Sequence, residues 1–261
     1  MEFKIDLHIH TIYSDGTMEP VDVVTKFKDE GYDIIAITDH DGIGGIREAQ
    51  IAGKALKIEV LPGIEFSSEY VRDGRMTELH ILGYRIDPSN ERLLQKCEFL
   101  KATRADRNVR MLARLREMGY DISEKDLPKK PGDYIGKPDV VRALLAKGYE
   151  LEDPFALLEG IPRERISTEE AIEIIREAGG TPVLAHPFKI RELSPREEGF
   201  RDRLDALLRD LKKLGIRGLE CFHPSANHEE SLMLVELAEK YHLNMTKGSD
   251  FHGDKEPLRK R

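Results

Sequence analysis

The chain has 261 residues, a formal net charge of −8 and a mean hydropathy of −0.48. No stretch approaches the roughly 18 consecutive apolar residues of a membrane-spanning helix, and the first residues lack the basic and apolar regions of a signal peptide. Two cysteines without CxxC spacing are too few for a disulfide framework. We therefore expect a cytoplasmic protein that binds neither a membrane nor duplex DNA.

The predicted elements alternate between strands and helices. Residues 3–10 alternate as a strand does, residues 20–30 carry apolar side chains at helical spacing, and residues 33–38 form the continuous apolar run of a strand buried in a parallel sheet. The same patterns predict helices over 43–56, 168–178, 203–214 and 229–241, and strands over 59–64, 78–83, 181–185, 216–222 and 244–249. This alternation predicts a parallel α/β sheet, either open or closed into a barrel.

Residues 90–165 interrupt the alternation, because their pattern is mostly helical and basic. Between residues 96 and 147, 13 Lys and Arg residues stand against 8 Asp and Glu residues. Basic side chains recur close to one helix face at Lys101, Arg104, Arg107, Arg110 and Arg114. A charge run alone favours a solvated surface stripe, and the alternative is a basic cap that attracts a phosphate-rich substrate. We predict a main domain over 1–89 and 166–261, with an insertion over 90–165.

Imidazole and carboxylate side chains fall at or near the carboxyl ends of six predicted strands. They are His8, His10, Asp15, His40, Glu65, His80, His186, Asp250 and His252. In parallel α/β folds this rim is where ligands bind. Each residue alone has an ordinary explanation in a loop or core, but two pairs, HIH and DFH, have the spacing that places both side chains on one face of a strand.

We therefore predict one shared metal site. The candidates include no cysteine, which excludes a thiolate-type zinc site. A mixed set of imidazoles and carboxylates suits Mn²⁺, Fe²⁺ or Zn²⁺ in a hydrolytic site.

Seven segments resemble, in order, those of the PHP (polymerase and histidinol phosphatase) family: DLHIHTIYSDG, AITDHDGIGG, PGIEFSSEY, ELHILGY, PVLAHP, LECFHPSANHEE and GSDFHG. The pattern with a mid-chain insertion is similar to small phosphoesterases of nucleotides, including 3′,5′-nucleoside bisphosphate phosphatases and 5′→3′ exoribonucleases of short RNA. The resemblance implies a distorted (β/α)7 barrel of seven parallel strands with a helical insertion. It also implies two or three divalent ions, with Mn²⁺ expected first and Zn²⁺ or Fe²⁺ as alternatives.

By position, the resemblance also implies a ligand set for each ion. The first ion is assigned to His8, His10, Glu65 and Asp250. Glu65 bridges to a second ion, completed by His80 and His186, and a third is assigned to Asp15, His40 and His252. Asp15 and Glu65 are thus placed among the catalytic groups, as ligands and not as covalent nucleophiles.

Other residues are candidates on weaker grounds. His223 follows a strand at the same rim, where it contacts phosphate or protonates the leaving oxygen, or else is a structural turn histidine before Pro224. The candidates for substrate binding are Ser14, Lys189, Arg104, Arg107 and Lys137. For Lys189 the alternative is a surface role. Arg104 and Arg107 are candidate contacts from the predicted basic cap. We assign His242 to structure.

Two departures from the family pattern stand out. Residues 135–139 read IGKPD where nucleotide-acting relatives carry an IGRPH-like motif, so substrate contact by Asp139 is in doubt. Members of the family extend slightly beyond the end of this chain, so a late closing element is expected to be short or absent.

Together these features predict a metal-dependent phosphatase that hydrolyses a phosphate monoester of a small nucleotide through a metal-activated hydroxide. A nucleoside 3′,5′-bisphosphate is the type of substrate expected. Three alternatives stay open. They are a 5′→3′ exoribonuclease that guides short single-stranded RNA along the basic cap, a histidinol-phosphate phosphatase, and a non-catalytic metal-bound module that binds nucleotides or a protein.

Overall fold

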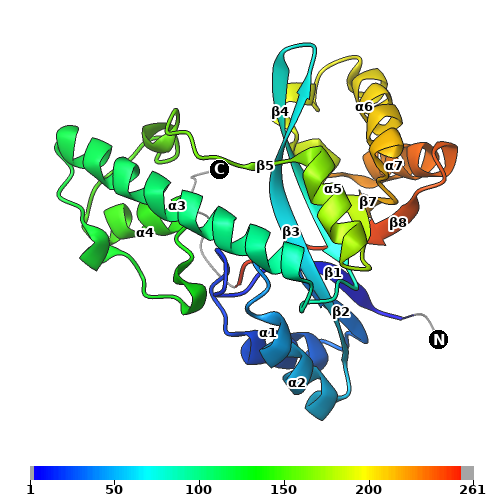
Figure 1. Ribbon diagram of the computed structural model, residues 1–261, viewed down its shortest axis with the longest axis horizontal. Helices are drawn as coiled ribbons and strands as arrows, with labels where there is room; N and C mark the ends of the chain where they lie inside the picture. The colour runs from blue at the N-terminus through cyan, green and yellow to red at the C-terminus, as the bar shows by residue number, and fades with distance from the viewer. Residues whose placement is uncertain (1–2, 254–261) are drawn as a thin grey trace.

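The computed structural model describes residues 3–253 as a curled β-sheet with helices around it and a helical insertion at one side (Figure 1). The sheet order is β1 (Ile5–Ile9), β2 (Ile34–Ile37), β3 (Glu59–Arg72), β4 (Arg75–Tyr84), β6 (Thr181–Leu184), β7 (Gly218–Phe222) and β8 (Asn244–Lys247), and β5 (Ile166–Ser167) pairs with β3. The expected late closing element lies outside the described residues.

Five helices pack on the sheet: α1 (Pro20–Asp29), α2 (Ile46–Leu56), α5 (Thr168–Glu177), α6 (Phe200–Leu214) and α7 (His228–Lys240). The insertion contains α3 (Glu91–Glu117) and α4 (Lys137–Ala146). Single 3₁₀ turns occur at Glu124–Asp126, Pro131–Asp133, Ala156–Leu158, Pro187–Lys189 and Arg191–Leu193. No helix between residues 3 and 253 has the length and apolar character needed to cross a membrane.

Within residues 3–253, the two edges of the sheet meet where the carboxyl end of β1 contacts the segment after β8. Ile9 and Phe251 form an isolated parallel bridge, in which the N–H of His10 donates to the carbonyl of Phe251 at 2.8 Å. The sheet therefore curls into the predicted kind of distorted α/β barrel, drawn together at the rim where the sequence places its imidazoles and acids.

One strand departs from the all-parallel expectation, because β4 runs antiparallel to both β3 and β6. β3 and β4 form a long hairpin joined by Asp73 and Gly74, whose φ values are both positive, at 51° and 74°. Two residues with positive φ make the kind of turn that favours an antiparallel hairpin, whereas parallel strands need a crossover of a dozen or more residues. Both strands are consequently longer than the predicted 59–64 and 78–83.

The alternation in β1 decides which side chains enter the barrel. Ile9 packs outward against Val23, Val24 and Phe27 of α1 in an apolar cluster. Because successive side chains of a strand point to opposite faces, His8 lies on the inner face, where it is fully buried.

The insertion contains an apolar cluster of its own. The N-terminal half of α3 places Leu93 and Leu100 in the main core, whereas Met111 and Leu115 of its C-terminal half pack with Leu144 of α4. One helix thus joins the barrel to the insertion, and the predicted domain limits at residues 90 and 165 stay predictions.

Asp139, whose predicted substrate contact was in doubt, ties the insertion together. Its side chain is 1% exposed and accepts hydrogen bonds from the N–H of Gly136 and from Lys130 Nζ, both at 2.9 Å, and from Arg142 at 2.8 Å. Lys130 also donates to the carbonyl of Ser14, at 2.7 Å, in the loop after β1. Asp139 therefore fixes the start of α4 and, through Lys130, seats the insertion on the barrel.

We expect Asp139→Ala to lower the free energy of unfolding by about 3 kcal/mol, because it leaves Lys130 buried without its counter-charge. The matched control is Asp106→Ala, since Asp106 is exposed and pairs with Arg110 one helical turn away. That exposed pair contributes about 0.5 kcal/mol or less. Urea unfolding followed by circular dichroism measures both, and equal small losses would contradict the role given to Asp139.

Candidate metal centre

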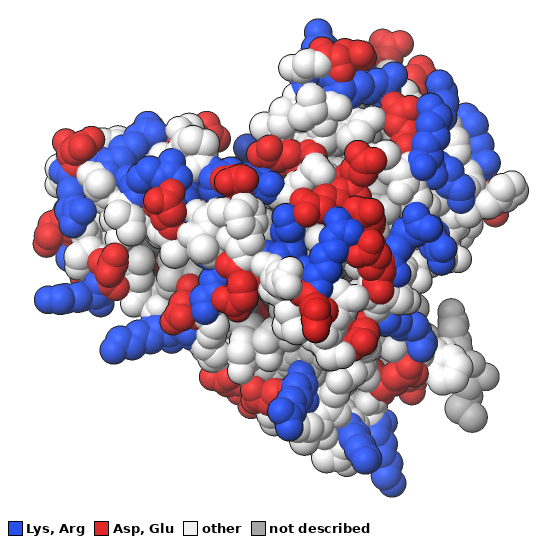
Figure 2. Space-filling model, in the orientation of Figure 1, with Lys and Arg blue, Asp and Glu red and all other residues white. Residues whose placement is uncertain are grey.

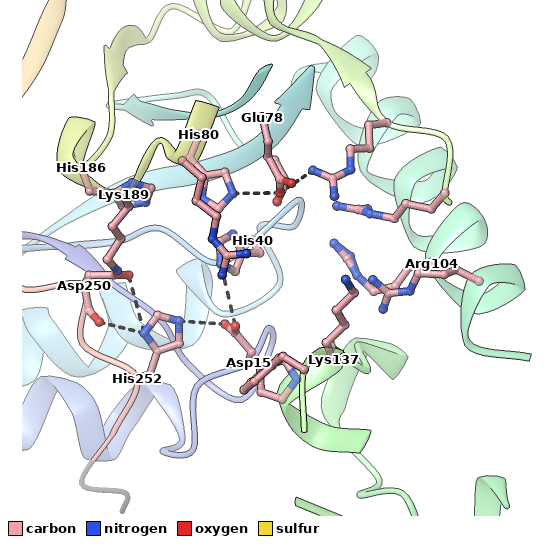
Figure 3. Close-up of a pocket in the computed structure, with 18 of the residues that line it drawn as sticks. Asp15, His40, Glu78, His80, Arg104, Lys137, His186, Lys189, Asp250 and His252 are labelled. Atoms are coloured by element: carbon pink, nitrogen blue, oxygen red, sulfur yellow. Dashed lines mark hydrogen bonds and ion pairs between the residues drawn. The ribbon is translucent and has the colours of Figure 1, made fainter. Parts of the chain in front are cut away.

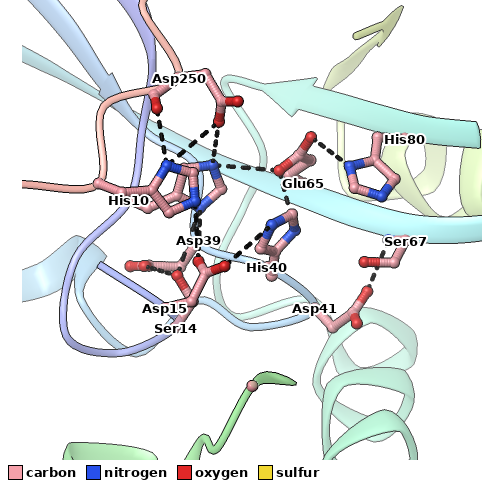
Figure 4. Close-up of polar contacts among 12 residues, drawn as sticks. His10, Ser14, Asp15, Asp39, His40, Asp41, Glu65, Ser67, His80 and Asp250 are labelled. Carbon is pink, nitrogen blue, oxygen red and sulfur yellow. Dashed lines mark hydrogen bonds and ion pairs between the residues drawn. The ribbon is translucent and has the colours of Figure 1, made fainter. Parts of the chain in front are cut away.

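Glu65 of β3 lies at the centre of a cluster of imidazoles (Figure 4). Its carboxylate is fully buried, and its two oxygens lie between 2.9 and 3.3 Å from ring nitrogens of His8, His10, His40, His80 and His186. Burial alone raises the pKa of Glu65, but the surrounding imidazoles outweigh it and hold that pKa well below its usual value. The cluster therefore contains an ionised carboxylate that has no access to water.

Four donor atoms of this cluster have the separations expected around a tetrahedral cation. His8 Nε2 lies 3.3 Å from Glu65 Oε2 and 3.4 Å from Asp250 Oδ1, and His10 Nε2 lies 3.2 Å from each of the same oxygens. Ligands held at about 2.1 Å from a tetrahedral ion would be about 3.4 Å apart.

The tautomer of His8 supports the same interpretation. Its Nδ1 lies 3.0 Å from Glu220 Oε1, so Nδ1 is the nitrogen that donates and Nε2 of the neutral ring has only a lone pair. A lone pair that faces two carboxylate oxygens is repelled by them unless a cation or a proton lies between.

Several buried atoms of the cluster have no hydrogen-bond partner within residues 3–253. They are His8 Nε2, His10 Nε2, Asp15 Oδ1, His40 Nδ1, Glu65 Oε2 and His186 Nδ1. Leaving buried polar atoms without partners is costly, and native proteins normally satisfy them. The residues present therefore fit divalent cations, which would take up these lone pairs.

All nine predicted ligands come together in one cluster. The structure groups His8, His10, Glu65 and Asp250, as the resemblance implied. His40 joins Glu65 and His80 in a second group, in which His186 was expected, while His186 Nε2 lies 3.0 Å from Glu65 Oε1. A third group combines Asp15, His40 and His252 with His10. The assignment of each ligand to a particular ion stays a prediction.

His80 reaches the cluster in a different way from the one expected. It lies within β4, not at a carboxyl end, and its backbone pairs with Ser67 of β3. Residues paired across two strands point to the same face, and so do residues two apart on one strand. His80 therefore shares a face with Ser67 and Glu65.

Glu220 is a functional candidate that the sequence analysis missed. It is fully buried on β7, where Oε1 lies against His8 Nδ1 and Oε2 accepts the N–H of His186 at 2.8 Å. It thereby orients one predicted ligand directly and a second through its backbone, since His186 has an unfavourable φ of 27°. The signal was an acid in the apolar run 218–222, because a buried acid needs partners.

Ser14 does not occupy the substrate-contact position predicted for it. It is fully buried behind His10, and its hydroxyl donates to Asp39. Asp39 also accepts the N–H of Thr11 at 2.7 Å, so it holds the loop after β1 in place. The side chain of Ser14 therefore bonds to Asp39 and is not among the residues that line the cavity described below.

His223 lies beside the cluster, on its Asp250 side. Its Nδ1 accepts the N–H of Ser225 at 2.9 Å, so the neutral ring carries its proton on Nε2, which lies 3.6 Å from Asp250 Oδ2. The residue is nearly buried and is not part of the cavity wall described next. Its role as a proton donor stays a prediction.

A cavity of about 480 Å³ separates the cluster from the insertion (Figure 3). Its barrel wall is formed by Asp15, His40, His80, His186, Asp250 and His252. The opposite wall carries five cations: Arg104, Arg107, Lys137, Arg163 and Arg165. The first three were predicted, whereas Arg163 and Arg165, on the segment that returns to the barrel, were not. Lys189 lies at the barrel side, where it pairs with Asp250.

The basic residues of the insertion divide into two groups. Arg104 and Arg107 are buried and line the cavity, whereas Arg110 is on the surface and pairs with Asp106 at 2.8 Å. On the face shown in Figure 2, the exposed Lys and Arg of the insertion are interspersed with Asp and Glu. The predicted surface stripe thus describes Arg110, whereas the attraction of a phosphate-rich substrate by Arg104 and Arg107 stays a prediction.

The cations of this wall are buried or half-buried and repel one another. Burial, together with the guanidinium groups of Arg104 and Arg163, lowers the pKa of Arg107 to about 9. Burial and Arg107 also lower the pKa of Lys137. Cations whose charged forms are disfavoured in this way are stabilised by an anion, so the wall is suited to bind one.

The chain matches the PHP domain family over residues 6–216. A phosphoribosyl 1,2-cyclic phosphate 1,2-diphosphodiesterase of Eggerthella lenta is 30% identical over 95% of this chain and 94% of its own length. A 5′-3′ exoribonuclease of Haemophilus influenzae is 28% identical over 97% and 91%, and a 3′,5′-nucleoside bisphosphate phosphatase of Chromobacterium violaceum is 30% identical over 95% and 87%.

The solved structure of a metal-dependent phosphoesterase from Bifidobacterium adolescentis superposes with a TM-score of 0.80 at 31% identity, covering 98% of this chain and 90% of that one. This likeness confirms the predicted fold class. The match over most of the chain and the similarity to these phosphoesterases identify the chain as a member of the PHP family and a hydrolase of phosphoester bonds.

Proposed function

We propose that this chain is a metal-dependent phosphatase that removes a phosphate monoester from a small nucleotide, of which a nucleoside 3′,5′-bisphosphate is the expected type. One observation carries the proposal: a single cavity has an imidazole–carboxylate cluster on one wall and five cations on the other. A substrate with two phosphates satisfies both walls at once. The volume of about 480 Å³ is in the range of small-molecule sites.

The three ligand groups around Glu65 are the proposed sites for two or three divalent ions. The donors are nitrogen and oxygen only, which suits Mn²⁺ first and also Zn²⁺ or Fe²⁺. When bound, such ions supply charge stabilisation for phosphoryl oxygens and lower the pKa of water from about 15.7 toward 7.

The side chains around the cavity then have separate tasks. Lys189, which pairs with Asp250, is the proposed contact for the phosphate that reacts. Arg107 and Lys137 of the opposite wall hold the remainder of the substrate by its anionic groups. His223, which lies outside the cavity wall beside Asp250, is the proposed donor of a proton to the leaving oxygen, since its Nε2 carries the proton when Ser225 occupies Nδ1.

The substrate class is tested by phosphate release in the presence of Mn²⁺. We expect kcat/KM to be highest for adenosine 3′,5′-bisphosphate, because this small substrate offers a phosphate monoester to each wall. The comparison substrates are adenosine monophosphate, histidinol phosphate, a ribosyl 1,2-cyclic phosphate and 5′-phosphorylated oligoribonucleotides. Faster stepwise shortening of the oligomers would instead establish the exoribonuclease, and no turnover by metal-loaded protein would establish a binding module.

The ligand set is tested by substitution within the first group. We expect His10→Ala and Asp250→Ala each to lower metal content and to reduce kcat/KM by about 100-fold or more, since second-sphere changes alone cost 10–100-fold. His242→Ala is the control, because His242 is exposed and lies outside the cluster. Metal analysis and phosphate release measure both properties, and equal losses in all three variants would show that the site is misassigned.

Metal binding should also depend on pH. Without metal, the nearby carboxylates of Asp250 and Glu65 outweigh burial and raise the pKa of His10 to about 10, while those of Glu65 and Glu78 raise the pKa of His80 to about 9. Both rings are therefore protonated at pH 8, and an incoming cation must displace these protons. We expect proton release on Mn²⁺ binding and an apparent affinity that rises from pH 7 to 9.

Calorimetry in buffers of different ionisation enthalpy measures the protons released. An affinity that stays constant across this pH range would contradict metal binding by these imidazoles.

A further inference from the structure

Asp41 connects the metal cluster to the cationic wall. It follows His40 directly, and its N–H donates to the carbonyl of Glu65 at 2.9 Å. Its Oδ1 accepts the N–H of Ser67 at 2.8 Å. The carboxylate is buried, and the residue has a positive φ of 53°, which Asp and Asn adopt more readily than other residues with a side chain. Asp41 is thus held in one position against β3.

Two arginines from separate parts of the chain converge on the other oxygen of this carboxylate. Arg104 of α3 and Arg163 of the returning segment both donate to Asp41 Oδ2, the second at 2.9 Å. Both side chains are at most 5% exposed, and the guanidinium of Arg104 also lies over the ring of Tyr134, 4.0 Å from its centre. Asp41 therefore holds together two like charges that would otherwise repel each other.

The two guanidinium groups still have donors to spare. Nη1 of Arg104 and Nη1 of Arg163 are buried and have no partner within the described residues. Both arginines line the cavity, and Figure 3 shows Arg104 on the wall opposite the imidazoles. One carboxylate balances only one of the two positive charges, so the pair keeps a net charge of about +1 and two free donor groups.

We propose that Asp41 is a positioning residue, which orients Arg104 and Arg163 so that their free Nη1 groups receive the second phosphate of the substrate at a fixed distance from His40. This inference rests on the proposed function, because only a substrate with a second phosphate makes use of the pair. Its ligand class is a phosphate dianion on a small nucleotide.

A different role for Asp41 predicts the opposite effect. If Asp41 served only to neutralise the arginines, its removal would leave the wall more positive and would tighten the binding of a phosphate dianion. If Asp41 positions them, its removal lets the guanidinium groups separate and weakens that binding despite the added charge. The sign of the change in KM therefore distinguishes the two roles.

The experiment compares Asp41→Asn with Asp133→Asn in the metal-loaded enzyme. Asp133 is 86% exposed and pairs with Lys101 at 3.2 Å, so its variant changes the net charge by the same amount at the surface. For adenosine 3′,5′-bisphosphate we expect Asp41→Asn to raise KM by about 10-fold or more, since hydrogen bonds to charged groups are lost, with kcat nearly unchanged. The KM for a mononucleotide should change little, and Asp133→Asn should match the wild type.

A second variant tests position with the charge retained. Asp41→Glu keeps the carboxylate but moves it by one methylene, so we expect KM for the bisphosphate to rise here too, whereas neutralisation alone predicts the wild-type KM. An unchanged or lower KM in both folded variants would overturn the inference. Thermal unfolding shows whether each variant is folded.

The two levels of proposal fail in different ways. If the wild type does not hydrolyse the bisphosphate, the proposed function is contradicted. The role of Asp41 is then decided by equilibrium binding of adenosine 3′,5′-bisphosphate to the same metal-loaded proteins, where weaker binding by Asp41→Asn and Asp41→Glu supports it and unchanged or tighter binding overturns it.

Discussion

The contact between the Glu65 carboxylate and five imidazoles constrains the rest of the barrel. A fully buried anion is unstable unless positive charge or cations surround it, and here the compensating groups come from β1, β4 and the segments after β2 and β6. Each of these segments must therefore reach the same point with little freedom. The bridge between Ile9 and Phe251 serves this requirement, since it draws the edges of the sheet together directly beside His10 and Asp250.

The antiparallel β4 brings His80 to the Glu65 carboxylate through a short hairpin connection. A parallel neighbour of β3 would need a crossover helix before it could deliver a side chain to the cluster. The turn at Asp73 and Gly74 instead returns the chain at once, and the register that pairs His80 with Ser67 places the imidazole on the face of Glu65. A local feature of the backbone thus supplies two of the metal-competent groups from consecutive strands.

The sequence predicts the groups that belong to local patterns and misses those that depend on distant partners. HIH and DFH have the spacing of one strand face, so their convergence could be inferred. The Asp-Gly turn was also a local signal, but the apolar runs beside it were interpreted as separate parallel strands. Arg163 could not be paired with Asp41 from the sequence, because the two are 122 residues apart. Glu220 likewise acts on His8, 212 residues away.

The spacing of the basic residues on α3 was also interpreted too simply. Residues three apart on a helix differ by about 60° in direction, so a run at this spacing turns gradually around the helix. Arg104 and Arg107 therefore line the cavity, while Arg110 lies outside it.

The two walls of the cavity come from different parts of the chain, and this separation explains how a common barrel can accompany varied substrates. The imidazoles and acids are carried by the barrel, whose geometry Glu65 restricts, whereas the five cations of the opposite wall all lie between residues 90 and 165, in the predicted insertion. Changes in the insertion would therefore alter the cationic wall without altering the residues of the cluster. The relatives, which are named for three different phosphoester substrates, agree with such a division. Asp41 connects the two walls. One oxygen of its carboxylate accepts a backbone N–H of β3, and the other accepts hydrogen bonds from Arg104 and Arg163 of the cationic wall. Through that one carboxylate, the position of the cationic wall relative to the imidazole–carboxylate cluster is tied to the backbone of β3.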